Sequence, residues 1–274
     1  MVMSIQKEGV QLICGADLEP EMMPWVWKNW LVAGKVHILG GEPGTGKTTI
    51  ALSLAATITM GGLWPDRTSS EPGNILIASD TNNLQSTLLP GLLAHGANPN
   101  HISFMPDFFK HRKTRAFDWV QAISQLYEKA SKIGGLKLIM IDPMVYFYSH
   151  NVQRNVEFRR GLQSLAALGK QLNAVILGIC PFTQQNLEHD PVERVIRSLG
   201  GSTLPRVVLV TAQEVHPDGK VLPVLLRVKS TYAPEGGGYY YDLKKIELPH
   251  HPGVFSSQVV WGDSIERNTV TLKK

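Results

Sequence analysis

The chain has 274 residues, of which 43% are hydrophobic and 18% charged, and its net charge of +4 permits contact with nucleic acid without requiring it. No apolar stretch approaches the roughly 18 residues that cross a bilayer, and no signal-peptide block opens the chain, so a cytoplasmic protein without a membrane partner is expected. Its two cysteines, Cys14 and Cys180, lie far apart and indicate neither a disulfide framework nor a metal site.

An N-terminal segment, residues 1–34, precedes the first clear strand signal. It holds three tryptophans close together, Trp25, Trp27 and Trp30. Because aromatic side chains most often serve packing, we expect an edge strand or lid that packs on the domain. The alternative is an aromatic wall beside a nucleotide base.

Residues 35–60 contain the most informative pattern of the chain. A short apolar strand signal is followed by Gly41-x-x-x-x-Gly46-Lys47-Thr48, the spacing of a P-loop (Walker A motif), and then by apolar residues at helical spacing. In such a loop the backbone N–H groups face phosphate oxygens, Lys47 can reach the β- and γ-phosphates, and Thr48 can hold Mg²⁺. The sequence therefore predicts binding of ATP and Mg²⁺ by Gly41, Glu42, Pro43, Gly44, Thr45, Gly46, Lys47, Thr48 and Thr49.

The middle of the chain alternates strand and helix signals. Buried strands are predicted at 74–79, 102–105 and 136–142, and helices from about residue 84 and at 117–132. The last of these strands ends in Asp142, and P-loop enzymes use an acid at such a place to hold Mg²⁺. We therefore predict Thr48 and Asp142 as the metal site. The alternative for Asp142 is a turn aspartate before Pro143.

The last third of the chain continues the alternation and then changes to strands. A helix is predicted at 155–172, a strand at 174–179, a polar connection at 181–200 and strands at 206–212, 221–229 and 239–243. This order predicts an α/β fold with a mainly parallel twisted sheet, helices on both faces and antiparallel C-terminal edge strands. Residues 1–34 are then an N-terminal segment packed on the core, 35–248 the ATPase domain and 249–274 a C-terminal tail.

Several segments occur in an order that resembles a known family. They are Gly41-Glu-Pro-Gly-Thr-Gly-Lys-Thr48, the strand at 73–79, Leu138-Ile-Met-Ile-Asp142-Pro143, the helix end Leu165-Ala-Ala-Leu-Gly-Lys-Gln171 and Arg227-Val-Lys229-Ser230. Over about residues 20–245 the chain resembles the RecA-like P-loop ATPases of the plasmid RepA type, the hexameric replicative helicases.

The resemblance implies a RecA-like fold and Mg²⁺-dependent ATP hydrolysis in a homo-oligomer, a hexameric ring that translocates on single-stranded DNA. Arg227 and Lys229 then become candidates for contact with a neighbour's γ-phosphate, where positive charge stabilises the transition state. Alternation of period two places both on one sheet face, so they could act together. Arg206 is a rival for this role, and the alternative for all three is ordinary surface or edge-strand charge.

Two positions depart from the pattern of that family. Its second strand normally ends in a glutamate that polarises the attacking water, and here Asp80 takes that place with an arm about 1.5 Å shorter, one C–C bond. A slip of one residue would place Thr81 there instead, and a hydroxyl cannot act as a general base near pH 7. A later strand normally precedes a histidine and a lysine, which are replaced by Pro181 and by Gln184 or Gln185. With Lys47, Asp80 and Asp142 as the catalytic set, we expect intact ATP·Mg²⁺ binding and weak or partner-dependent hydrolysis.

Two segments are candidates for contact with nucleic acid. Residues 108–115 mix cations with aromatics, the combination that follows phosphates and stacks on bases. The connection at 184–201, with Arg194 and Arg197, occupies the place of a DNA-binding loop in RecA-like rings. The alternative for each is a solvated loop.

These features allow three functions. The first is an ATP-driven motor or helicase on single-stranded DNA. The second is a nucleotide-gated regulatory or DNA-binding subunit with weak or no intrinsic ATPase activity. A third, weaker interpretation is a small-molecule kinase, although an arginine-rich lid and a substrate pocket are not evident in the sequence.

Overall fold

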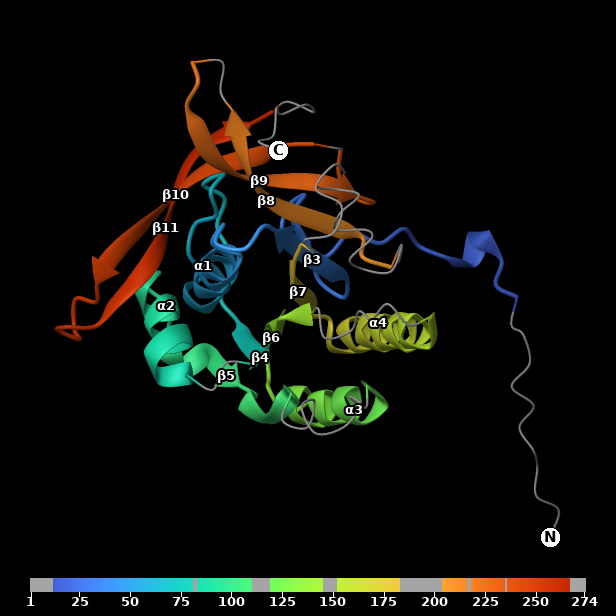
Figure 1. Ribbon diagram of the computed structural model, residues 1–274. Helices are drawn as coiled ribbons and strands as arrows, with labels where there is room; N and C mark the ends of the chain where they lie inside the picture. Colours follow the sequence, from blue (N-terminus) through green and yellow to red (C-terminus); the bar gives the residue numbers. More distant parts are fainter. Residues whose placement is uncertain are drawn as a thin grey trace, which may run out of the picture.

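A single mixed sheet organises the computed structural model of the protein, which describes residues 12–80, 83–109, 119–144, 152–182, 204–215, 218–234 and 236–266 (Figure 1). Its strands are β3 (Val36–Gly41), β4 (Asn74–Ser79), β5 (Ile102–Phe104), β6 (Leu136–Asp142), β7 (Val175–Pro181), β8 (Val207–Val215), β9 (Val221–Ser230), β10 (Gly238–Glu247) and β11 (Phe255–Ile265). The main helices are α1 (Lys47–Met60), α2 (Leu89–Ala94), α3 (Trp119–Ala130) and α4 (Val152–Leu172). A separate hairpin joins β1 (Trp25–Trp27) to β2 (Leu31–Val32).

The strand order explains how the sheet combines two kinds of pairing. Within the described residues the nine strands follow the order β11-β10-β9-β8-β3-β7-β6-β4-β5. The six from β8 to β5 are parallel, whereas β9, β10 and β11 add to this core in antiparallel fashion. The predicted mainly parallel sheet with antiparallel C-terminal edge strands is therefore confirmed.

Alternate residues of the buried strands face two separate cores. In β4, Ile75 and Ile77 pack in the core that contains Ile50 of α1, while Leu76 packs with Leu126 of α3 in the other. Figure 1 shows α1 and α2 on one side of the strands and α3 and α4 on the other. Since both faces are covered, the parallel strands read as continuous apolar runs, and the chain has the α/β, RecA-like P-loop architecture expected from its sequence.

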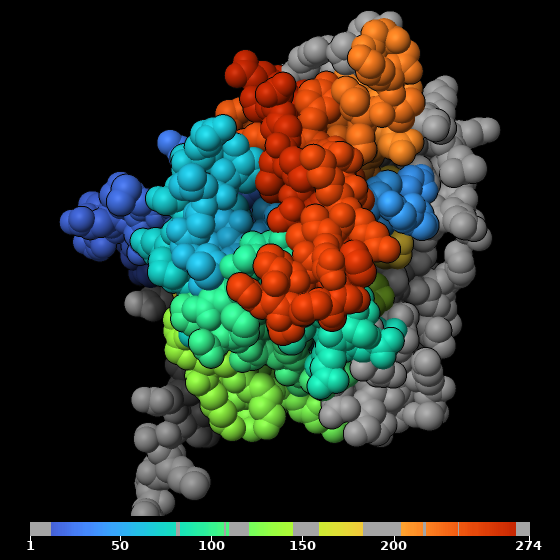
Figure 2. All heavy atoms as spheres, turned by 90° about the vertical axis from the view of Figure 1, so that its left-hand side faces the viewer, coloured from blue at the N-terminus to red at the C-terminus, as the bar shows by residue number. Residues whose placement is uncertain are grey.

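Helix α1 is apolar around most of its circumference because it is covered on two sides. It contacts the sheet through β3, β4, β6 and β7, and on its other side it contacts α2 and β11. Most of its apolar residues, from Ile50 to Ile58, are buried. Figure 2 shows the hairpin of β10 and β11 lying across this side of the molecule. A helix enclosed in this way has no solvent face to fill with polar residues.

Two of the three N-terminal tryptophans, Trp27 and Trp30, are packing residues, in agreement with the first interpretation, while Trp25 is half-buried. Trp27 and Trp30 are 1% and 5% exposed, and their rings stack with centroids 4.7 Å apart. Trp27 also stacks on Trp64 at 5.0 Å and donates from Nε1 to Asp66 Oδ2 at 2.9 Å. The cluster continues to Tyr239 of β10, so it joins the N-terminal segment to the antiparallel strands.

The segment predicted as a C-terminal tail, residues 249–274, contains a full strand of the sheet. Strand β11 pairs with β10 from Phe255 opposite Glu247 to Ile265 opposite Gly238. It also donates from the Val259 N–H to Nε2 of His95 at 2.8 Å, at the end of α2. Residues 255–265 are thus integral to the domain.

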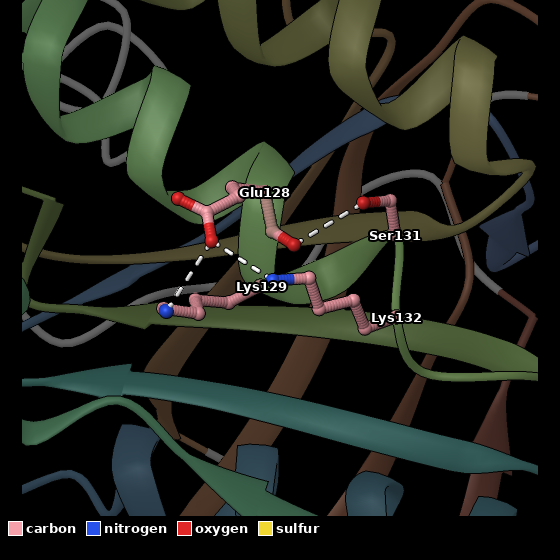
Figure 3. A network of polar contacts seen from close by, with 4 residues as sticks. All are labelled: Glu128, Lys129, Ser131 and Lys132. Carbon is pink, nitrogen blue, oxygen red and sulfur yellow. Dashed lines mark hydrogen bonds and ion pairs between the residues drawn. The ribbon is translucent and has the colours of Figure 1, made fainter.

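A polar network on the surface marks the end of α3 (Figure 3). The Glu128 carboxylate accepts from Lys132 at 2.9 Å and lies 3.4 Å from the amine of Lys129, while the Ser131 hydroxyl donates to the Glu128 carbonyl at 3.2 Å. The charged side chains are more than half exposed, and such pairs contribute little to stability.

Among the described residues, no helix is both long and apolar enough to span a membrane.

Candidate nucleotide-binding site

The P-loop forms the turn between β3 and α1. Gly41 is the last residue of β3, residues 42–46 make the turn, and Lys47, Thr48 and Thr49 open α1, so all nine predicted residues lie together. Gly44 and Gly46 have φ angles of 81° and 79°, which only glycine adopts without strain. The turn therefore brings several backbone N–H groups to the positive end of the α1 dipole, an arrangement that binds phosphate.

Lys47 is held inside the loop. The side chain is 9% exposed and donates from Nζ to the Glu42 carbonyl at 2.7 Å. Burial lowers the pKa of Lys47, and the nearby charges of Asp142 and Glu42 oppose that shift. The amine is thus a cation held by the loop backbone and close to the charges of Asp142 and Glu42.

Thr48 and Asp142 meet although 94 residues separate them. The Thr48 hydroxyl donates to Asp142 Oδ2 at 2.9 Å, across β7, which lies between β3 and β6 in the sheet. Burial raises the pKa of Asp142, and both the Thr48 hydrogen bond and the charge of Lys47 counteract it. A hydroxyl and a carboxylate are the hard oxygen ligands that Mg²⁺ takes alongside phosphate and water. The donor set therefore fits Mg²⁺, which Thr48 and Asp142 would hold.

Asp80 lies beside this pair. It follows β4 directly, and its backbone N–H donates to the Asp142 carbonyl at 3.0 Å. Its charge adds to the rise in the Asp142 pKa, which is caused mainly by burial. The structure thus brings Asp80, which follows β4, next to Asp142 at the end of β6. Thr81, the alternative in a slipped register, lies outside the described residues.

The end of β7 approaches the P-loop through its backbone. Pro181 pairs with Gly41, and the Phe182 N–H donates to the Gly41 carbonyl at 2.9 Å. Cys180 is fully buried, which raises the pKa of its thiol to about 12. The described part of this strand end therefore offers no charged group to a γ-phosphate. Gln184 and Gln185 lie outside the described residues.

Arg227 is buried in contacts within its own chain. Its guanidinium donates to the Asn29 carbonyl at 3.0 Å and to the Pro234 carbonyl at 2.9 Å, and it lies 5.0 Å from the centre of the Trp30 ring. Burial lowers the pKa of Arg227, which is 7% exposed. This position favours a structural role, tying the N-terminal hairpin to the loop before β10.

The expectation that Arg227 and Lys229 share a sheet face is wrong. Opposite them on β8, Leu209 pairs with Arg227 and Val208 with Lys229, so one extra residue of β9 forms a bulge between the two pairs. Val208 and Leu209 face different cores, and directly opposed residues point to the same side. The bulge therefore sends the two cations to opposite faces of the sheet.

Lys229 and Arg206 lie far from the P-loop of their own chain. Burial lowers the pKa of Lys229, and the charge of Arg206 lowers it further, so the two cations are neighbours. They flank the start of β8, which pairs with the start of β3, whereas the P-loop follows the end of β3. A contact of either cation with a neighbour's nucleotide stays a prediction.

The candidate nucleic-acid segments fall mostly outside the described residues. This holds for residues 110–115 of the first segment and for all of 184–201, including Arg194 and Arg197. The described part of the first segment consists of Phe108 and Phe109, which are 4% and 2% exposed and pack edge to face in the core with α3. These two rings are therefore core residues and are not exposed for stacking on bases.

Sequence reasoning missed three residues of β8 and β10 that contact the P-loop. Thr211 of β8 places its hydroxyl 2.6 Å from that of Thr45, and the Tyr241 hydroxyl of β10 donates to the Thr45 carbonyl at 2.6 Å. Leu243 also packs against Gly46, where an added Cβ would lie 2.6 Å from Cδ1 of this leucine. A threonine, a tyrosine and a leucine on ordinary strands carry no motif, so no sequence signal identifies them.

The comparisons with known proteins agree with this geometry. A family model described as AAA domain matches residues 10–184, which is more than half of the 274 residues and includes the P-loop, Asp80 and Asp142. No curated protein matches the sequence. The chain belongs to the AAA-domain family of P-loop ATPases.

Proposed function

We propose that this protein binds ATP with Mg²⁺ and hydrolyses it as a RecA-like motor coupled to single-stranded DNA. The observation that carries the ATPase chemistry is the convergence of Lys47, Thr48 and Asp142, with Thr48 and Asp142 joined at 2.9 Å. When bound, Mg²⁺ neutralises charge on the phosphates and supports transfer of the γ-phosphoryl group. Lys47 adds a second positive charge, and Asp80 is the nearby carboxylate that orients or deprotonates the attacking water.

Coupling to DNA and assembly into a ring belong to the same proposal. They are supported by the resemblance to RepA-type helicases and by the mixed sheet, whose order joins a parallel P-loop core to three antiparallel strands. The net charge of +4 is compatible with a polyanionic partner. In this arrangement Arg206 and Lys229, which are remote from their own P-loop, are candidates for contact with a neighbouring subunit's nucleotide.

A second candidate is a nucleotide-gated regulatory subunit that hydrolyses slowly. It is favoured by the end of β7, where Cys180 and Pro181 supply no charge near the loop, and by the short arm of Asp80. Such a protein would bind ATP·Mg²⁺ tightly and use it to control assembly. The two candidates share the binding site and differ in turnover.

The test is the ATPase rate with and without single-stranded DNA, for the wild type and for Asp80→Ala. Strong stimulation by DNA that is lost in Asp80→Ala supports the motor. Tight ATP binding without turnover under any condition supports the regulatory subunit. Asp263→Ala, which removes an exposed carboxylate of the edge strand β11, is the matched control and should behave as the wild type.

Two further measurements test binding and assembly. Lys47→Ala should lose ATP binding and all activity, because the loop loses its central cation, and unchanged affinity in this variant would refute the nucleotide site. The molecular mass in solution, with and without ATP·Mg²⁺, reports whether a ring forms. A monomer under both conditions would contradict the ring.

A further inference from the structure

The tip of the P-loop rests on two hydroxyl groups from strands that follow it far along the chain. Tyr241, which is 4% exposed, donates to the Thr45 carbonyl at 2.6 Å. The hydroxyls of Thr211 and Thr45 lie 2.6 Å apart, and either can donate. Thr211 also reaches the Gly40 carbonyl at 3.3 Å, and Thr45 reaches the Glu42 carbonyl at 2.8 Å. The two hydroxyls have two protons between them, so one donates to the other and the acceptor donates on to its own carbonyl, and in either arrangement the Thr45–Thr211 bond joins β8 to the loop.

The bond from Tyr241 fixes the direction of one peptide group. In a trans peptide the carbonyl of one residue and the N–H of the next point in opposite directions. Anchoring the Thr45 carbonyl towards β10 therefore directs the Gly46 N–H away from β10. Gly46 is the last residue before α1, within the stretch whose N–H groups cradle phosphate in a P-loop.

Packing around Gly46 restricts the same peptide group. The φ angle of Gly46 is 79°, and Leu243 of β10 lies so close that an added Cβ would be 2.6 Å from its Cδ1. The loop thus packs against the Leu243 side chain of β10 and is hydrogen-bonded to the Tyr241 hydroxyl of the same strand. An unsupported glycine peptide would rotate between several orientations, and few of them present the N–H to an anion.

We infer that Tyr241 and Thr211 are positioning residues for phosphate binding: they hold the Thr45–Gly46 peptide group in the orientation that receives the nucleotide's phosphates. This inference rests on the proposed function, because it concerns the affinity of the same site. It assigns the antiparallel strands β8 and β10 a direct part in nucleotide binding. Neither residue touches the reacting atoms, so both act through Thr45.

The experiment compares Tyr241→Phe with Tyr240→Phe. Both variants remove one hydroxyl from adjacent residues of β10, but Tyr240 donates to Glu214 and not to the P-loop. The probes are Mg·ADP and Mg·tripolyphosphate, measured by titration calorimetry, since the second reports the phosphate cradle without a base. Loss of one hydrogen bond predicts about tenfold weaker binding of both probes to Tyr241→Phe and unchanged binding to Tyr240→Phe.

Substitutions at Thr211 test the same idea from β8. Thr211→Val keeps the shape and removes the hydroxyl, and it should weaken binding of both probes about fivefold, whereas Thr211→Ser should restore wild-type affinity. Because both hydroxyls act on Thr45, the double variant of Tyr241→Phe with Thr211→Val should lose less than the two single losses combined. Serine keeps the hydroxyl but lacks the methyl group, so wild-type affinity in Thr211→Ser would show that the hydrogen bond, and not the packing of the methyl group, supports binding.

The outcomes separate this inference from the proposed function. If Tyr241→Phe binds both probes like the wild type while Lys47→Ala binds neither, the inference is wrong and the nucleotide site stands. Equal losses in Tyr241→Phe and Tyr240→Phe would also overturn it, because the effect would then come from the strand as a whole. If Lys47→Ala binds normally, the nucleotide site itself is refuted and the inference falls with it.

Discussion

His37 is a fully buried histidine in the strand that leads to the P-loop, and it predicts a specific dependence of stability on pH. Its Nε2 accepts from the Val32 N–H at 3.1 Å, and its Nδ1 lies 3.1 Å from the Lys35 carbonyl, so the neutral ring with a proton on Nδ1 satisfies both. A second proton would have to enter the core on the nitrogen that accepts from Val32. Burial accordingly lowers the pKa of His37 from 6.5 to about 4.

The size and sign of the effect follow from that shift. Because the folded-state pKa lies below the unfolded one, the unfolded chain binds more protons between these values. The contribution of His37 to the unfolding free energy is therefore constant above about pH 6.5 and falls as the pH drops towards about 4. The full loss is about 3 kcal/mol, of which about 2 kcal/mol has accrued at about pH 5.

Substitution by glutamine isolates this contribution. His37→Gln removes the titrating group, while an amide oxygen can still accept from the Val32 N–H. Urea unfolding of both proteins at about pH 7.5 and about pH 5 gives the change in unfolding free energy for each. Other groups, including Asp142 with its raised pKa, titrate in both proteins and cancel. The wild type should lose about 2 kcal/mol more than the variant, and equal losses would refute the argument.

Two other substitutions test structural assignments. Arg227→Met should lower the unfolding free energy, measured in urea, by about 2–4 kcal/mol, because it removes the two hydrogen bonds that the guanidinium donates to the Asn29 and Pro234 carbonyls. The affinity for Mg·ADP should be unchanged. The control is Arg206→Gln, which changes an exposed arginine and should not destabilise the fold. A stable Arg227→Met with impaired hydrolysis would instead favour a role at a neighbour's site. Gly41→Ala should destabilise the fold by about 3 kcal/mol or more, since its Cβ would lie 1.9 Å from the Thr211 hydroxyl and 2.7 Å from the Thr211 carbonyl oxygen. Adding Thr211→Ala should not restore stability, and a rescue measured by urea unfolding would contradict the backbone clash.

Most of the candidate site could be predicted because its signals are local. The P-loop is a run of consecutive residues whose glycines and lysine have fixed roles, and Asp142 ends an apolar strand that any period-based reading finds. Their convergence required only the rule that parallel strands bring their carboxyl ends to one edge of a sheet. The long apolar runs likewise predicted a sheet covered on both faces.

The missed features depend on contacts that a linear pattern cannot show. Tyr241 reaches Thr45 over 196 residues, and a strand tyrosine looks the same whether it binds a loop or faces solvent. The bulge in β9 adds one residue and so reverses the alternation that had placed Arg227 and Lys229 together. Strand β11 looked like a tail because only Val259 and Ile265 are buried along its length, which leaves a weak apolar signal.

The distance in sequence between the P-loop and Tyr241 has a consequence for synthesis of the protein. The ribosome makes the 196 residues that separate Thr45 from Tyr241 in about 10–40 s, at ordinary rates of elongation. During that interval the nascent chain contains the complete P-loop but lacks β10, the strand whose Tyr241 holds the Thr45 carbonyl. Affinity for nucleotide should therefore reach its full value only after β10 has been made and has paired with the sheet.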